Sequence, residues 1–186
     1  TTNYTPISFR KVKALRISSA YEDEKQDRLI SITPYVRYNS MEMLPNWSLS
    51  YDPQHYKTEN NSIGVLAKYR RDFVPQRTRM ILGVDLDYSP GKYKENRVNL
   101  TKVGSIYTSY TDGYISYDYD VSYSGISPYA HVETSLSDKL LLTGGLRLDY
   151  ISYDYENKLT TLTTGSRRRP ASTTVDFDHI SPKLGM

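Results

Sequence analysis

Apolar and polar side chains alternate along most of the chain, which is the two-residue period of a β-strand with two different faces. The clearest stretch spans 140–150, where even positions are leucine, glycine or tyrosine and the odd positions include Arg147 and Asp149. A second stretch, 80–88, places apolar residues and a final Tyr88 on one face and Asp85 on the other. Both stretches are therefore predicted to be strands with one apolar and one polar face.

Weaker forms of the same alternation predict five further strands. Four of them are expected at 8–21, 29–39, 62–70 and 125–134, and a seventh begins around Phe177. Helical periodicity is scarce in this chain. The fold class predicted is therefore all-β, with about seven strands.

Short and long connections alternate between these predicted strands. The short ones are 22–27, 73–77 and 136–139, and the long ones are 40–61, 89–124 and 156–174. In an up-and-down antiparallel sheet every second connection lies at the same end, so the long ones are expected together. Tight turns at one end and long loops at the other are typical of bacterial outer-membrane barrels. The pattern predicts an antiparallel up-and-down segment of a transmembrane β-barrel in the bacterial outer membrane.

The apolar faces of the predicted strands are expected to contact membrane lipid. Tyr38, Tyr88 and Tyr150 end three apolar rows on the long-loop side, where an aromatic girdle would meet the lipid headgroups. Charges of both signs on the opposite faces suit a polar lumen. The residues predicted to face lipid are Leu82, Val84, Leu86, Tyr88, Leu142, Leu146, Leu148 and Tyr150. A soluble β-barrel with its apolar face inward, which binds a small apolar ligand, is the alternative.

Composition excludes several other classes of protein. The 186 residues carry 24 Lys and Arg against 21 Asp and Glu, so no strong basic excess favours nucleic acid. There is no cysteine for a disulfide framework, and the three histidines lack the spacing of a metal or haem site. No cofactor or metal is expected, and no catalytic motif indicates an enzyme. An outer-membrane enzyme that uses His131 at the barrel rim is the least favoured alternative.

Four stretches, taken in order, resemble the barrel strands of TonB-dependent receptors. They are 69–73 (Tyr-Arg-Arg-Asp-Phe), 81–91 with its Gly-Val-Asp-Leu-Asp-Tyr run, 140–155 with Gly-Leu-Arg-Leu-Asp-Tyr, and 177–185 with Ser-Pro-Lys-Leu-Gly. Each motif is loose, but their order and spacing cover about two-thirds of the chain.

This resemblance implies a 22-stranded outer-membrane barrel closed by an N-terminal plug domain. Such receptors bind a scarce ligand, usually a ferric siderophore, in their extracellular loops and plug, and TonB supplies energy through the plug. Residues 1–186 contain no plug-like motif and are all assigned to the barrel domain. We therefore expect a wall segment of a longer receptor, with contacts to lipid, to a ferric-siderophore-like ligand and, through the missing plug, to TonB. Two open sheet edges would also let isolated segments associate with one another.

Two polar stretches are candidates for ligand contact. Tyrosines interleaved with aspartates between 107 and 123 could present rigid phenols to a ligand in an extracellular loop and at a strand end. The arginines that begin at Arg167, in the last long connection, could clamp an anionic iron complex or lipid phosphates. Strand packing and a solvated loop are the respective alternatives. The candidate residues are Tyr110, Tyr114, Tyr117, Tyr119, Arg167 and Arg168.

Overall fold

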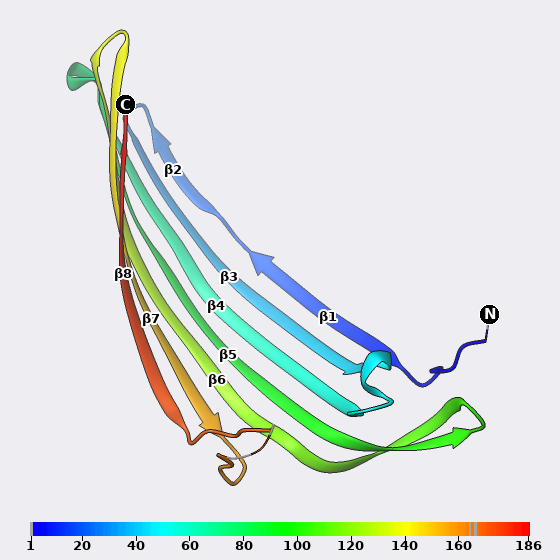
Figure 1. The fold of residues 1–186 in the computed structure, drawn as a ribbon. Coiled ribbons are helices and arrows are strands. Elements are labelled where there is room, and N and C mark those ends of the chain that lie inside the picture. Colours follow the sequence, from blue (N-terminus) through cyan, green and yellow to red (C-terminus); the bar gives the residue numbers. More distant parts are fainter. Residues whose placement is uncertain (1, 164, 166) are drawn as a thin grey trace.

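A computed structural model describes residues 2–163, 165 and 167–186. Within these residues one antiparallel sheet contains eight strands in the order β1-β3-β4-β5-β6-β7-β8, with β2 also paired to β3 (Figure 1). The strands are β1 (Phe9–Ser18), β2 (Tyr21–Lys25), β3 (Arg28–Leu44), β4 (Gln54–Phe73), β5 (Thr78–Val103), β6 (Ile106–Ser137), β7 (Leu140–Asn157) and β8 (Thr173–Gly185). Two short 3-10 helices, η1 (Asn46–Ser48) and η2 (Val74–Gln76), lie in connections. None of the described helices is long and apolar enough to cross a membrane.

The prediction of an all-β, up-and-down antiparallel sheet is confirmed. Because β1 and β2 pair with the same strand, seven strand positions lie across the sheet, as the alternation predicted. The sheet does not close on itself, so β1 and β8 leave its two sides open (Figure 1).

The register joins the apolar positions of neighbouring strands into continuous rows. One row runs through Pro34, Val65, Leu86, Ile126 and Tyr150, each paired directly with the next. Directly paired residues in antiparallel strands share a face. The eight residues predicted to face lipid therefore all lie on one face, which we call the apolar face.

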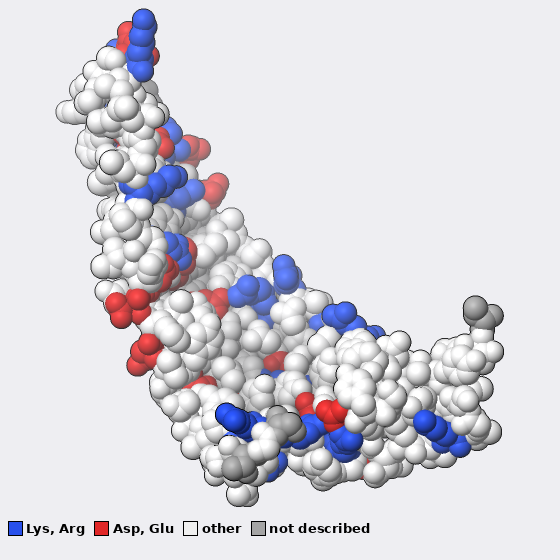
Figure 2. Space-filling model, viewed as in Figure 1, with Lys and Arg blue, Asp and Glu red and all other residues white. Residues whose placement is uncertain are grey.

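The apolar face is uncovered in the described chain. Leu82 is 41% exposed and Leu146 is 46% exposed, although both lie in the middle of strands. Charged side chains gather along the inner, concave side of the bent sheet, and some acidic side chains also project from its outer contour (Figure 2). The expected alternative, a sealed apolar centre, is therefore not what this sheet forms.

Buried apolar side chains gather instead at one end of the sheet. Leu44, Leu49, Val98 and Tyr107 form this cluster, and Phe9 packs against it. The residues come from the end of β3, the connection after it, the C-terminal part of β5 and the start of β6. This small core fixes the end of the sheet at which the candidate site lies.

Two of the three predicted long connections are wrong. Residues 89–124 are not a loop, because β5 continues to Val103 and β6 starts at Ile106. Gly104, with φ of +59°, supplies the left-handed conformation that this tight turn requires. The β5–β6 hairpin therefore projects beyond the neighbouring strands (Figure 1). In the same way, the connection predicted at 40–61 shrinks to 45–53.

The physical reason for this error is that polar composition does not distinguish an extended strand from a loop. Both faces of the strands are polar beyond the apolar rows, yet tyrosine and threonine still favour extended backbone there. The predicted charged turn at 22–27 is wrong for the same reason, because Tyr21–Lys25 forms β2 and only two residues turn. The long connection predicted at 156–174 is confirmed, since the described residues between Asn157 and Thr173 form no named strand.

Candidate functional site

A row of tyrosines crosses four strands on the face opposite the apolar face, which we call the polar face. Tyr56 on β4, Tyr93 on β5, Tyr119 on β6 and Tyr155 on β7 are successive neighbours. Their ring centroids are 6.2, 5.0 and 5.2 Å apart along this row. Tyr117 meets Tyr93 edge-on at 6.5 Å. These five residues, the tyrosine row, form a continuous aromatic surface beyond the end of the apolar rows.

The arginine-bearing connection folds back over the tyrosine row. Arg167 Nη2 lies 2.6 and 2.7 Å from the two carboxylate oxygens of Asp52, and its Nη1 pairs with Glu95. Arg97 pairs with the same Asp52. Tyr93 donates a hydrogen bond of 2.7 Å to Glu95. Asp52, Glu95, Arg97 and Arg167 thus form an ion-pair cluster that ties two connections to β5.

Burial sets the electrostatics of this site. Glu95 is only 5% exposed, so its charge depends on the arginine and phenol that contact it. Burial, and then the hydrogen bond to Glu95, raises the pKa of the Tyr93 phenol. Burial also raises the pKa of the Tyr119 phenol. The tyrosine row therefore offers neutral phenols and aromatic faces to a ligand.

Below the tyrosine row, the polar face carries charge pairs that bridge strands. Arg147 on β7 contacts Asp85 on β5 at 2.7 Å and Asp149 at 2.8 Å. Arg37 on β3 contacts Asp87 on β5 at 2.6 Å. These pairs lie back to back with the apolar rows, so the two faces of the same strands have opposite chemistry.

Comparison with known proteins identifies the family of this two-faced sheet. A family model described as "TonB dependent receptor-like, beta-barrel" matches residues 2–186. The chain belongs to this family. A search of curated proteins found no match.

Solved receptor structures share the fold of this TonB-dependent receptor barrel segment. The ferric yersiniabactin uptake receptor FyuA from Yersinia pestis has a TM-score of 0.64 at 11% identity, and 94% of this chain covers 25% of that one. The copper transporter OprC has a TM-score of 0.63 at 15% identity, with 94% and 27% covered. The ferric citrate transporter FecA, in its unliganded form, has a TM-score of 0.61 at 14% identity, with 93% and 23% covered. The chain thus spans about a quarter of each solved receptor chain.

In this receptor segment the structure brings together only some of the predicted ligand residues. Tyr117, Tyr119 and Arg167 meet at the tyrosine row and the ion-pair cluster. Tyr110 lies elsewhere, with its ring 5.7 Å from that of His55, and Tyr114 is 63% exposed. All four predicted tyrosines lie on β6 and none in a loop, which corrects their expected location. Arg168 is exposed in the 158–172 connection, where a loop was predicted.

Sequence reasoning missed six members of this site. They are Asp52, Tyr56, Tyr93, Glu95, Arg97 and Tyr155. The alternation at 92–95 (Lys-Tyr-Lys-Glu) continues the strand past Tyr88 and could have placed Tyr93 beside Tyr119. His131, the candidate catalytic residue of the enzyme alternative, contacts Glu133 at 3.1 Å on the polar face. Within the described residues no cluster of three metal-ligating side chains occurs.

Proposed function

We propose that this chain is a wall segment of an outer-membrane receptor that binds an iron complex or a similarly scarce nutrient. The receptor imports this ligand with energy that TonB supplies through a plug domain. The segment contributes binding and transport and no catalysis. The observation that carries the proposal is the two-faced sheet, in which strands that carry apolar rows on one face bear bridging charge pairs, Arg37–Asp87 and Arg147–Asp85, on the other. This arrangement suits a wall between lipid and a water-filled lumen.

In this proposal the apolar face contacts lipid and the polar face lines the lumen. The apolar part of β5 spans 80–88, close to the ~9–11 residues that a tilted strand needs to cross a bilayer. Tyr88 and Tyr150 end this band, at the level of the lipid headgroups. The tyrosine row then lies on the lumen side, outside the membrane, where a ligand enters.

The ligand class follows from the family and from the chemistry of the tyrosine row. The solved relatives are an uptake receptor for ferric yersiniabactin, a copper transporter and a ferric citrate transporter. Stacked neutral phenols provide rigid, amphipathic contact area, which suits the organic shell of a metal complex. Because Arg167 is engaged with two carboxylates, the exposed Arg168 is the arginine that we assign to an anionic ligand.

Ligand binding by the whole receptor that contains this chain tests the proposal. Y117A/Y119A is expected to weaken binding of the preferred ferric complex about tenfold, since two aromatic contacts are lost. The control is Y21A, which removes an exposed tyrosine from β2 on the apolar face. Uptake of radioactive iron complexes, with copper complexes as competitors, separates iron from copper as the cargo. Equal binding by Y117A/Y119A, Y21A and the parent receptor would contradict the assigned site.

A further inference from the structure

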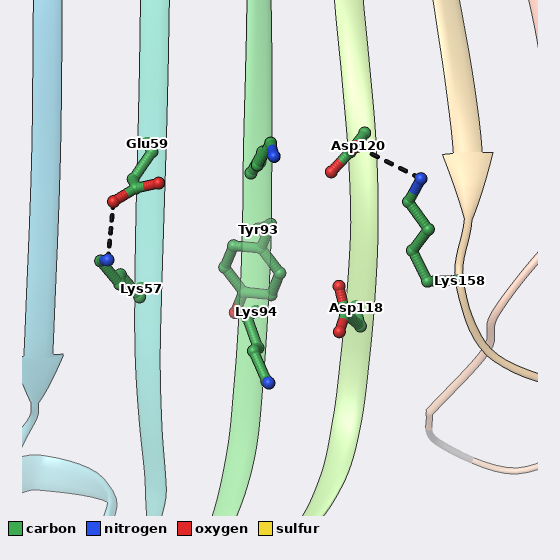
Figure 3. A pocket seen from close by; sticks show the side chains of 8 residues that line it. Lys57, Glu59, Tyr93, Lys94, Asp118, Asp120 and Lys158 are labelled. Carbon is green, nitrogen blue, oxygen red and sulfur yellow. Dashed lines mark ion pairs between the residues drawn. The ribbon is translucent and has the colours of Figure 1, made fainter.

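A charged hollow lies on the apolar face, directly beyond the end of the apolar rows. Its volume is about 350 Å³, and four lysines line it: Lys57, Lys92, Lys94 and Lys158 (Figure 3). We call it the lysine hollow. Tyr93 of the tyrosine row also lines the hollow, but Lys92 and Lys94 lie on the opposite face of β5 from the Tyr93 side chain, so their ammonium groups lie outside the site described above.

The register places the hollow on the lipid side of the strands. Lys92 and Lys94 follow Tyr88 on β5 at even spacing, and the pairing with β4 and β6 continues unshifted from Tyr88 to Lys94. Both lysines therefore point to the same side as Leu86 and Tyr88. An amphipathic lysine on this side can reach toward the membrane surface.

The distance from the apolar band matches the headgroup layer. Lys92 lies four residues past Tyr88, which is roughly 13 Å along a strand and about 9 Å along the membrane normal at a tilt near 45°. The polar layer on each side of a bilayer is ~5–8 Å thick. The ammonium groups of the hollow thus lie at or just above the level of lipid phosphates.

Two of the four lysines have charge available for a ligand. Lys57 pairs with Glu59 at 2.6 Å, and Lys158 pairs with Asp120 at 3.3 Å (Figure 3). Lys92 and Lys94 form no ion pair within the described residues, and both are exposed. Figure 3 shows that the Lys94 side chain points away from both the Lys57–Glu59 pair and the Lys158–Asp120 pair.

The carboxylates of the hollow shape the kind of anion it accepts. Four lysines line the hollow against three carboxylates, so its net positive charge is small. Recognition of an anion here must therefore come from the placement of individual ammonium groups. Two free ammonium groups set among paired charges instead suit a compact phosphate whose neighbouring hydroxyl groups hydrogen-bond to the carboxylates. A phosphorylated sugar headgroup has this chemistry.

We propose that the lysine hollow binds the phosphorylated sugar headgroup of an outer-leaflet lipid. This inference rests on the proposed function only in placing the apolar face in the membrane. Lys92 and Lys94 contact the phosphate, and the apolar rows below them contact the acyl chains. The bound lipid would seal the receptor wall where the strands leave the hydrocarbon.

The whole receptor in phosphatidylcholine nanodiscs tests this inference with two probes, phosphorylated lipid A and dephosphorylated lipid A. K92Q/K94Q is expected to bind phosphorylated lipid A about tenfold to thirtyfold more weakly than the parent receptor. K25Q/K139Q is the matched control, since it removes two exposed lysines at the opposite end of the strands, and it should bind like the parent. Dephosphorylated lipid A should bind all three proteins equally weakly.

Inorganic phosphate as competitor separates a lipid site from a site for free phosphate. Equal affinity of K92Q/K94Q and the parent receptor for phosphorylated lipid A would overturn the inference. Displacement by millimolar inorganic phosphate would also overturn it. Iron-complex uptake is measured on the same variants and is expected to be unchanged, because Lys92 and Lys94 lie on the opposite face of β5 from the side chains of the tyrosine row. Absence of iron-complex uptake by the parent receptor, with phosphorylated lipid A still bound, would contradict the proposed function and leave the lipid site standing.

Discussion

Arg147 on β7 reaches across β6 to Asp85 on β5, with Nη1 2.7 Å from Oδ2. The pair thus links two strands that share no backbone hydrogen bonds. Both side chains remain about a third exposed, so water and salt screen their attraction.

The first prediction concerns this bridge. A double-mutant cycle of R147A and D85A is expected to give a coupling energy of about 0.5–1 kcal/mol that falls as salt is added. Urea unfolding of the receptor in lipid vesicles at two ionic strengths measures it. A coupling energy of zero at low salt would show that the bridge does not stabilise the sheet.

The second prediction concerns the close approach of Tyr129 to Gly83. A Cβ at Gly83 would collide with the Tyr129 ring, which lies flat across the neighbouring strand. We expect G83A to lower the free energy of unfolding by about 1–3 kcal/mol, because the ring must move. The control is G144A, where an added Cβ meets nothing within 4 Å. Equal unfolding midpoints for the two variants would rule out the contact.

The sequence predicted the strands of the apolar rows well, and the register explains why. Leu86 pairs with an apolar residue on each neighbouring strand, Val65 and Ile126. The apolar face is therefore one continuous surface, and it imposes the two-residue alternation on each strand that crosses it. Beyond Tyr88 both faces of β5 carry mainly polar side chains, so no alternation of apolar and polar residues indicates that the strand continues. The pattern therefore predicts a loop at Tyr93 and Glu95, where β5 in fact continues. The contact between Arg167 and Asp52 joins residues far apart in the chain, and local pattern carries no information on such pairs.

The third prediction concerns the ion-pair cluster. R167A leaves the buried Glu95 without its arginine, so the 158–172 connection should detach from β5 and become more open to protease. Limited proteolysis of the folded receptor is the measurement, with R168A as the control. R167A/E95Q should recover part of the protection, since no buried charge then lacks a partner. Identical cleavage rates for R167A and R168A would exclude a holding role.

The fourth prediction concerns alkaline pH. Burial raises the pKa of Tyr93 above the ordinary value of 10.0, so this phenol stays protonated in the folded protein while the unfolded chain ionises. The folded state then binds more protons, and stability falls as pH rises above about 10. Y93F should reduce that slope by at most about 1.4 kcal/mol per pH unit. Unfolding midpoints between pH 9 and 12 measure it, and parallel curves for Y93F and the parent would count against the buried phenol.

The central claim is that the apolar face contacts lipid and the polar face contacts water. Leu82 and Lys68 test it at one height, because Lys68 pairs with Gly83, the neighbour of Leu82, and points to the other face. Single-cysteine variants L82C and K68C of the receptor carry a fluorescent label in vesicles that contain nitroxide-bearing lipids. The account predicts that lipid nitroxides quench the label at 82 and that aqueous iodide quenches the label at 68. Quenching of the label at 82 by iodide, with no effect of the lipid nitroxides, would contradict it.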